Sequence, residues 1–270
     1  MKLSISNIIW KKGKDNFEDF LKVIVANNIF AVELSLNSIF EEPLNMTQKD
    51  FIWLKELFIK YNVSVSALHS LTYTRPDLEI FNTKEKREEL LSYLLNYIEI
   101  AKKLNTKNLV YGSPKSRQLY DYSIEEANNI FISFLSKIDI KADGINFNIE
   151  PLPKLYCDYL NTFMDGVDIL KKSDFKNIFI QLDIRSIIES EENIDEIFNY
   201  DKYIRHVHIG EPNLTMPSEK YANIHLLLNT MLLHMRYNGY LSIEVLNHNQ
   251  NNFETYTKYT IDKVMYYYGK

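Results

Sequence analysis

The chain has 270 residues, of which 46% are hydrophobic and 25% are charged, so it can build a large core and is not disordered as its main state. Its 31 Lys and Arg residues against 36 Asp and Glu residues give a net charge of -5, which excludes a broad cationic surface for duplex DNA or anionic lipid. No apolar run approaches the ~18–20 residues that span a bilayer, and one cysteine, Cys157, excludes an internal disulfide. We therefore expect a cytoplasmic globular protein without a nucleic-acid or membrane partner.

Short β-rich segments recur about every 30 residues, and longer amphipathic patterns typical of helices separate them. The eight predicted strands are Leu3–Ile9, Ala31–Leu36, Val63–Leu71, Asn108–Tyr111, Asn146–Glu150, Ile178–Ile184, Ile204–Ile209 and Tyr240–Val245. The predicted helices are Asp15–Asn27, Phe51–Tyr61, Lys84–Leu104, one that begins after Ser123 with Glu126 completing a capping box, Thr162–Lys172, Asn193–Tyr200, Tyr221–Tyr237 and Phe253–Tyr268.

Strict alternation of strand and helix favours parallel pairing, because crossover helices connect parallel strands. Eight such units in this length favour an α/β fold of the closed (β/α)8 barrel type over an open doubly wound sheet. No linker or shift in composition divides the chain, so we expect a single barrel domain over residues 1–270.

Acidic and imidazole side chains stand at the ends of four successive predicted strands: Glu150, Asp183, His208 and Glu244. Since side chains alternate along a strand, all four are predicted to face one side, at the carboxyl ends where barrel enzymes carry their sites. A single acid at a strand end is more often a helix cap, but three converging carboxylates repel one another unless a cation joins them. The pattern predicts one divalent ion, Mn²⁺, Mg²⁺, Co²⁺ or Zn²⁺.

At these residues the sequence resembles the xylose-isomerase-like TIM-barrel family of sugar and sugar-phosphate isomerases and epimerases, over essentially the whole chain. The segments that carry the resemblance are Ile149-Glu-Pro-Leu-Pro153, Gln181-Leu-Asp183, His206-Val-His-Ile-Gly-Glu-Pro-Asn213 and Ser242-Ile-Glu244. The separations of 33, 25 and 36 residues between the two acids, the second histidine and the last glutamate look like those of the family's ketose 3-epimerases. The resemblance implies that Glu150, Asp183, His208 and Glu244 are metal ligands and that His206 is not.

The resemblance also implies a reaction. Glu150 and Glu244 would bracket a sugar, one removing a proton from the carbon next to a carbonyl and the other returning it through an enediolate. Lys115 and Arg117, in a loop that looks like family loops over the barrel mouth, suit an anionic group of the substrate. His69, Glu211 and Asn213 complete the predicted substrate-binding set, and Glu33 falls where the family places polar groups that face the substrate.

Three positions differ from the ketose 3-epimerases. Tyr156 stands in place of an acid, Ser186 in place of a histidine and Leu214 in place of an arginine, which argues against specificity for a free ketose. We expect a small sugar or sugar phosphate as partner, and a homo-oligomer is compatible with the sequence. The alternatives are a dehydratase with the same metal–enolate chemistry, a catalytically inert binding protein with this barrel, and a phosphodiesterase resembling endonuclease IV.

Overall fold

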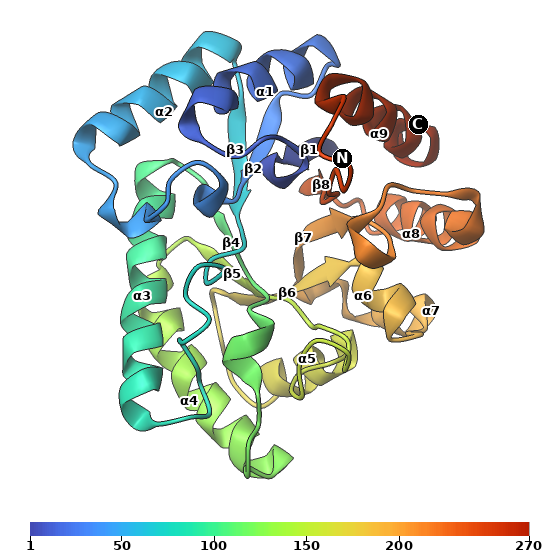
Figure 1. Ribbon diagram of the computed structural model, residues 1–270. Coiled ribbons are helices and arrows are strands. Elements are labelled where there is room, and N and C mark those ends of the chain that lie inside the picture. Colours follow the sequence, from blue (N-terminus) through green and yellow to red (C-terminus); the bar gives the residue numbers. More distant parts are fainter. Residues whose placement is uncertain (270) are drawn as a thin grey trace.

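The computed structural model describes residues 1–269, and its eight strands pair in chain order into one closed parallel barrel (Figure 1). The strands are β1 (Lys2–Ser6), β2 (Ala31–Leu34), β3 (Ser64–Leu68), β4 (Asn108–Tyr111), β5 (Asn146–Ile149), β6 (Ile178–Asp183), β7 (Ile204–Ile209) and β8 (Tyr240–Ile243). Pairing of β1 with β8 completes the ring. The predicted (β/α)8 architecture is confirmed, and the open sheet is excluded.

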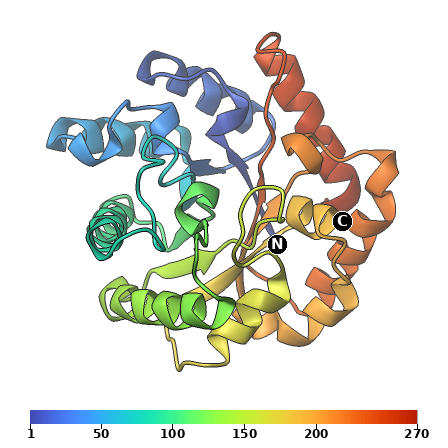
Figure 2. The ribbon, with the colours of Figure 1, turned by 60° about the horizontal axis from the view of Figure 1, so that its bottom comes forward.

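Helices surround the ring of strands in chain order, as Figure 2 shows. They are α1 (Lys14–Ala26), α2 (Gln48–Tyr61), α3 (Lys84–Lys103), α4 (Ile124–Ala142), α5 (Phe163–Leu170), α6 (Ile184–Glu189), α7 (Ile194–Ile197), α8 (Ala222–His234) and α9 (Phe253–Tyr268). The predicted capping box of α4 is confirmed, because the Ser123 hydroxyl accepts the Glu126 N–H and the Glu126 carboxylate accepts the Ser123 N–H. Among residues 1–269, no helix combines the length and the apolar character that crossing a membrane requires.

Two differences from the predicted elements occur at the carboxyl ends of strands. The first strand ends at Ser6 and a 3-10 turn follows, while the third ends at Leu68. Ile9 and Leu71 are nonetheless buried, so the apolar pattern continues after the strand hydrogen bonding has stopped. The second difference is α6, which was not predicted and begins directly after β6.

The two faces of the strands differ in chemistry. Outward side chains such as Phe147, Ile180 and Val207 join one large apolar cluster with the helices. The strands also carry a buried polar set that alternates with these residues along the chain: Ser4, Ser66, Asn148, Gln181 and Ser242. The hydroxyls of Ser4 and Ser66 lie 2.5 Å apart, and the amide of Asn148 donates to the carbonyl of Leu109. The barrel interior is therefore lined in part by polar groups.

Candidate metal centre

Four side chains meet at the carboxyl ends of β5 to β8, and we call them the strand-end group: Glu150, Asp183, His208 and Glu244. Glu150 directly follows β5, Asp183 ends β6, His208 lies within β7 and Glu244 directly follows β8. One potential ligand atom of each lies within 4.8 Å of those of the other three, and all four residues are largely buried. The structure thus brings together the four residues that strand alternation placed on one face.

The charges of this group compete strongly. Nδ1 of His208 lies 3.3 Å from Oε1 of Glu150 and 3.2 Å from Oε2 of Glu244. Burial raises the pKa of Asp183 to about 6, with Arg185 opposing the rise and the charges of Glu150 and Glu244 adding to it. Burial lowers the pKa of His208, but the carboxylates of Glu33 and Glu244 outweigh it and raise that pKa well above its ordinary value. Bound protons therefore offset part of the negative charge of this group, and a bound cation can offset that charge in their place.

The donor set fits a divalent cation. Oε1 of Glu150 and Oε2 of Glu244 are buried, and apart from their shared proximity to Nδ1 of His208 neither accepts a hydrogen bond, which is costly for carboxylate oxygens. A bound ion would supply the missing partner. Three carboxylates with one imidazole form a mixed oxygen and nitrogen site, which suits Mn²⁺, Mg²⁺, Co²⁺ or Zn²⁺.

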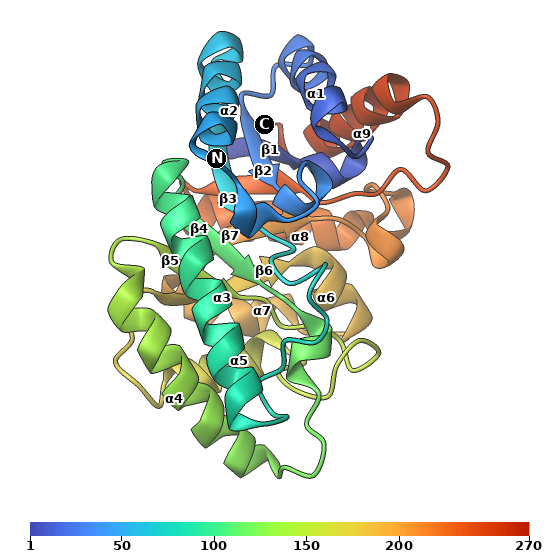
Figure 3. The ribbon, with the colours of Figure 1, turned by 60° about the vertical axis from the view of Figure 1, so that its left-hand side comes forward.

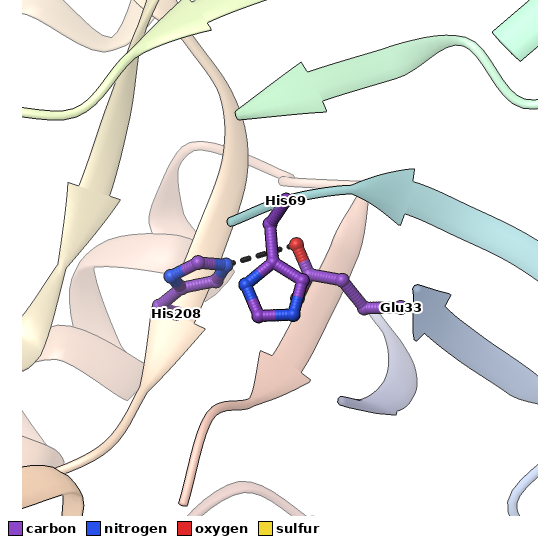
Figure 4. A group of neighbouring side chains, drawn as sticks. All are labelled: Glu33, His69 and His208. Atoms are coloured by element: carbon purple, nitrogen blue, oxygen red, sulfur yellow. Dashed lines mark hydrogen bonds and ion pairs between the residues drawn. The ribbon is translucent and has the colours of Figure 1, made fainter. Parts of the chain in front are cut away.

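Glu33 of β2 forms a hydrogen bond with a ring nitrogen of His208 (Figure 4). Its Oε1 accepts from Nε2 of His208 at 3.0 Å and from Nε2 of His206 at 3.1 Å. Burial raises the pKa of Glu33, but His208, His206 and His69 outweigh it and hold that pKa well below its ordinary value. Because Nε2–H of His208 donates to the Glu33 carboxylate, Nδ1 is the nitrogen left to bind an ion.

His69 directly follows β3 and contacts the strand-end group through Glu244. Its Nδ1 lies 3.3 Å from Oε1 of Glu244, and its Nε2 lies 2.7 Å from the hydroxyl of Ser6. The rings of His69 and His208, both drawn in Figure 4, meet edge to face. Their centroids lie 5.8 Å apart. Glu33, His69 and His208 also have ligand atoms within 4.8 Å of one another, but His208 belongs to both sets. The hydrogen bond between Glu33 and His208 indicates that this second set orients His208 and does not bind an ion of its own.

Two residues after β4 shape the position of Glu150. A Cβ atom on Gly112 would overlap an oxygen of the Glu150 carboxylate. Only glycine at this position therefore allows that oxygen to occupy its observed position. Arg117 ends a short 3-10 turn, Pro114–Arg117, and its Nη2 donates to the main-chain carbonyl of Glu150 at 2.9 Å. The loop after β4 therefore fixes both the main chain and the carboxylate of this ligand candidate.

The structure does not bring Lys115 and Arg117 together, although both were predicted to bind one anionic group of the substrate. Lys115 is exposed, whereas Arg117 is fully buried and bonded to the main chain, so the two cations do not share a surface. The turn that carries them rotates neighbouring side chains by about 120° per residue, which separates positions two apart. This placement does not support joint selection of an anionic substrate by the pair.

Glu211 and Asn213, the other predicted substrate contacts, are held by the loop between β7 and α8. The Glu211 carboxylate is buried and accepts from the Ser218 N–H and from Nε2 of His225 at 3.1 Å. Burial raises the pKa of Glu211, but the bonds from His225 and Ser218 outweigh it and lower that pKa. Asn213 is exposed, and its carbonyl accepts from His248 at 2.7 Å. Both residues tie the loop to its neighbours, and a role in substrate binding stays a prediction.

Sequence reasoning missed three features of the site: the proximity of Arg185, the space provided by Gly112, and the double contact of Glu33. Asp183 caps α6, since its Oδ1 accepts the Arg185 N–H at 2.9 Å, so the chain turns sharply and brings Arg185 back to the site. A cap residue directly after an apolar run was the available signal for this helix.

The comparisons with known proteins agree with the barrel fold. The family model described as "xylose isomerase-like TIM barrel" matches residues 21–264. A D-psicose 3-epimerase of Ruminiclostridium cellulolyticum is 32% identical over 78 residues, a stretch that covers 28% of this chain and 27% of that protein.

Two solved structures share the fold over the full length of both chains. A D-psicose 3-epimerase determined in the presence of D-fructose superposes with a TM-score of 0.82 at 13% identity. The IOLI protein with a bound zinc atom superposes with a TM-score of 0.75 at 19% identity. The match of the family model to most of the chain, together with the closed barrel, shows that this protein belongs to the xylose isomerase-like TIM barrel family.

Proposed function

We propose that the protein is a divalent-metal-dependent sugar epimerase or isomerase that transfers a proton through an enediolate. The observation that carries this proposal is the convergence of Glu150 and Glu244 on the same imidazole of His208, each through a buried oxygen that has no other partner. Two carboxylates beside one cation site form a set that can both remove and return a proton.

The strand-end group would hold the metal ion, with Nδ1 of His208 as the nitrogen ligand and the three carboxylates as oxygen ligands. When bound, a divalent cation polarises a carbonyl and stabilises the negative charge that develops when a neighbouring proton is removed. Glu33 keeps His208 in the required tautomer through the bond at 3.0 Å.

Glu150 and Glu244 then divide the proton transfer between them. One carboxylate takes the proton from the carbon next to the carbonyl, and the other gives a proton back. Return to the opposite face of the same carbon yields an epimer, whereas return to the neighbouring carbon yields an aldose–ketose isomer. A positioned general base of this kind typically contributes about 10²–10⁴-fold in rate.

The proposed substrate is a sugar, free or phosphorylated, with a carbonyl next to a carbon that carries both hydrogen and hydroxyl. Support comes from relatives named for D-psicose 3-epimerisation, one of which was solved with D-fructose. Tyr156, Ser186 and Leu214 distinguish this chain from the ketose 3-epimerases that it resembles, so the sugar differs from theirs. His69, beside Glu244, is the proposed substrate contact nearest to the carboxylates.

A deuterium experiment tests this function. The Mn²⁺-loaded protein is incubated in D₂O with a panel of free and phosphorylated ketoses and aldoses, and products are followed by NMR. The expected result is conversion with deuterium at the carbon next to the carbonyl. Glu150→Gln and Glu244→Gln keep a carbonyl ligand but lose the base, so each is expected to lower turnover by about 10²-fold or more.

Glu99→Gln, on the exposed face of α3, is the matched control and is expected to turn over like the wild type. Conversion of a sugar by the wild type without incorporation of deuterium would refute proton exchange with solvent during the transfer. Deuterium incorporation at the full rate in both Glu150→Gln and Glu244→Gln would refute the two-glutamate mechanism. Loss of water from the sugar would identify a dehydratase instead.

A further inference from the structure

Arg185 lies beside the strand-end group, and the proton transfer described above assigns no role to it. It stands in the first turn of α6, and its side chain is 14% exposed. Nη2 of Arg185 is 3.3 Å from Oδ2 of Asp183, and the guanidinium lies 5.5 Å from the centre of the Tyr156 ring. Carboxylate and ring together hold this cation at the carboxyl end of the barrel.

The guanidinium has hydrogen-bonding capacity that the protein does not use. Its Nε is buried and has no partner among the described residues. The surface residue Arg75, by contrast, uses both Nε and Nη2 to bind carboxylate oxygens. Because a buried N–H without an acceptor is costly, the environment of Arg185 favours an acceptor oxygen supplied by a ligand.

Arg185 carries a permanent positive charge, because the guanidinium of arginine is not deprotonated in proteins. A divalent cation balances only two of the three negative charges of the strand-end group. Arg185 adds a positive charge beside the group, which reduces the repulsion that an approaching anion meets.

Arg185 differs from the other two cations near the site in its access to a ligand. Lys115 lies exposed on its loop, and Arg117, whose Nε and Nη1 also lack a partner, is fully buried and donates to the main-chain carbonyl of Glu150, whereas the Arg185 side chain is partly exposed. Arg185 also differs from Arg117 in its neighbour, since it contacts a carboxylate of the strand-end group directly.

We infer that Arg185 is a substrate-binding residue that holds a negatively charged oxygen of the sugar next to the metal site. This inference rests on the proposed function, because it assumes that the sugar lies against the strand-end group. The charged oxygen has two sources: the permanent carboxylate of an acidic sugar, or the oxygen that gains charge as a neutral sugar loses its proton. The planar fork of arginine fits both.

Calorimetric binding to the Mn²⁺-loaded protein tests this assignment with three probes. Glycolohydroxamate is a planar anion that resembles an enediolate, D-glucuronate carries a permanent carboxylate, and D-fructose is neutral. Arg185→Gln removes the charge, Arg185→Lys keeps the charge without the fork, and Arg236→Gln at an exposed site is the matched control. Metal content and thermal unfolding of each variant establish that the fold and the ion are retained.

We expect Arg185→Gln to weaken binding of glycolohydroxamate by about tenfold or more, with Arg185→Lys intermediate and D-fructose unaffected. If Arg185→Gln loses affinity for glycolohydroxamate alone, Arg185 binds the oxygen that gains charge during proton removal. In that case kcat should fall in this variant while KM stays unchanged. A loss for D-glucuronate assigns a permanent carboxylate. Unchanged affinity for both anions in Arg185→Gln, or a wild type that binds neither, would overturn the inference.

Failure of the proposed function gives a different result. A wild type that converts no sugar, yet binds an anion in a way that depends on Arg185, would refute the epimerase or isomerase and uphold the anion-binding role of this residue. If the Arg185→Gln variant converts sugar at the wild-type rate and binds anions with unchanged affinity, the epimerase or isomerase function is upheld and the anion-binding role of Arg185 is refuted.

Discussion

Gly112 shows how one residue determines the position of a ligand candidate. Replacement by Ala inserts a Cβ atom where the Glu150 carboxylate lies, and that side chain must move away from the strand-end group. We expect Gly112→Ala to lower Mn²⁺ affinity by about tenfold or more, as losses of supporting groups around metal ligands typically do. Isothermal titration calorimetry measures this.

A double-mutant cycle distinguishes displacement of Glu150 from general damage. Glu150→Asp retracts the carboxylate by one methylene, so adding Gly112→Ala to it should cost little more affinity. Fully additive losses would show that Gly112 acts elsewhere.

Asp183 has two structural tasks that substitution can separate. Its carboxylate belongs to the strand-end group and also caps α6 through the Arg185 N–H. Asp183→Ala should abolish tight metal binding and lower the free energy of unfolding by about 1 kcal/mol, whereas Asp183→Asn should weaken metal binding through loss of the charge but keep the cap. Elemental analysis and urea unfolding measure the two effects. Undiminished metal stoichiometry in both variants contradicts the ligand assignment.

At the scale of elements, the start of α4 illustrates local stability that is independent of the site. Ser123 and Glu126 exchange side-chain and main-chain hydrogen bonds there. Ser123→Ala should lower the free energy of unfolding by about 1 kcal/mol, because the Glu126 N–H loses its acceptor. Denaturant unfolding measures the change, and metal affinity should stay at the wild-type value. A concurrent loss of affinity would reveal coupling between α4 and the centre.

How far sequence predicts an element depends on the range of the interactions that form it. The capping box and the inward face of Asp183 and His208 follow from neighbours in sequence, so they were predictable. The burial of Arg117 depends on its contact with Glu150, 33 residues away, and the pairing of Glu211 with His225 depends on how the β7–α8 loop folds back. No periodic pattern encodes such contacts, and Arg185 was missed for the same reason.

For the whole molecule, a bound ion should raise stability. The strand-end group draws on four separate strands, so its mutual repulsion acts on the barrel as a whole. We expect Mn²⁺ at a hundred times its Kd to stabilise the protein by about 2.7 kcal/mol, seen as a higher Tm that chelator reverses. Asp183→Ala is the control, and its Tm should not respond to Mn²⁺. An equal response there would locate the ion elsewhere.

The closure of the ring between β1 and β8 bears on the order in which the molecule assembles during synthesis. α1 and α9 lie side by side over this seam (Figure 3), so the first and last parts of the barrel meet only late. Until Tyr240–Ile243 has left the ribosome, β1 and β7 each keep an open edge, and contacts of such sequence separation form slowly. Glu244 follows that same strand. A nascent chain therefore acquires a complete set of ligands only in the step that closes its barrel, and an unfinished chain offers a metal ion only part of the site.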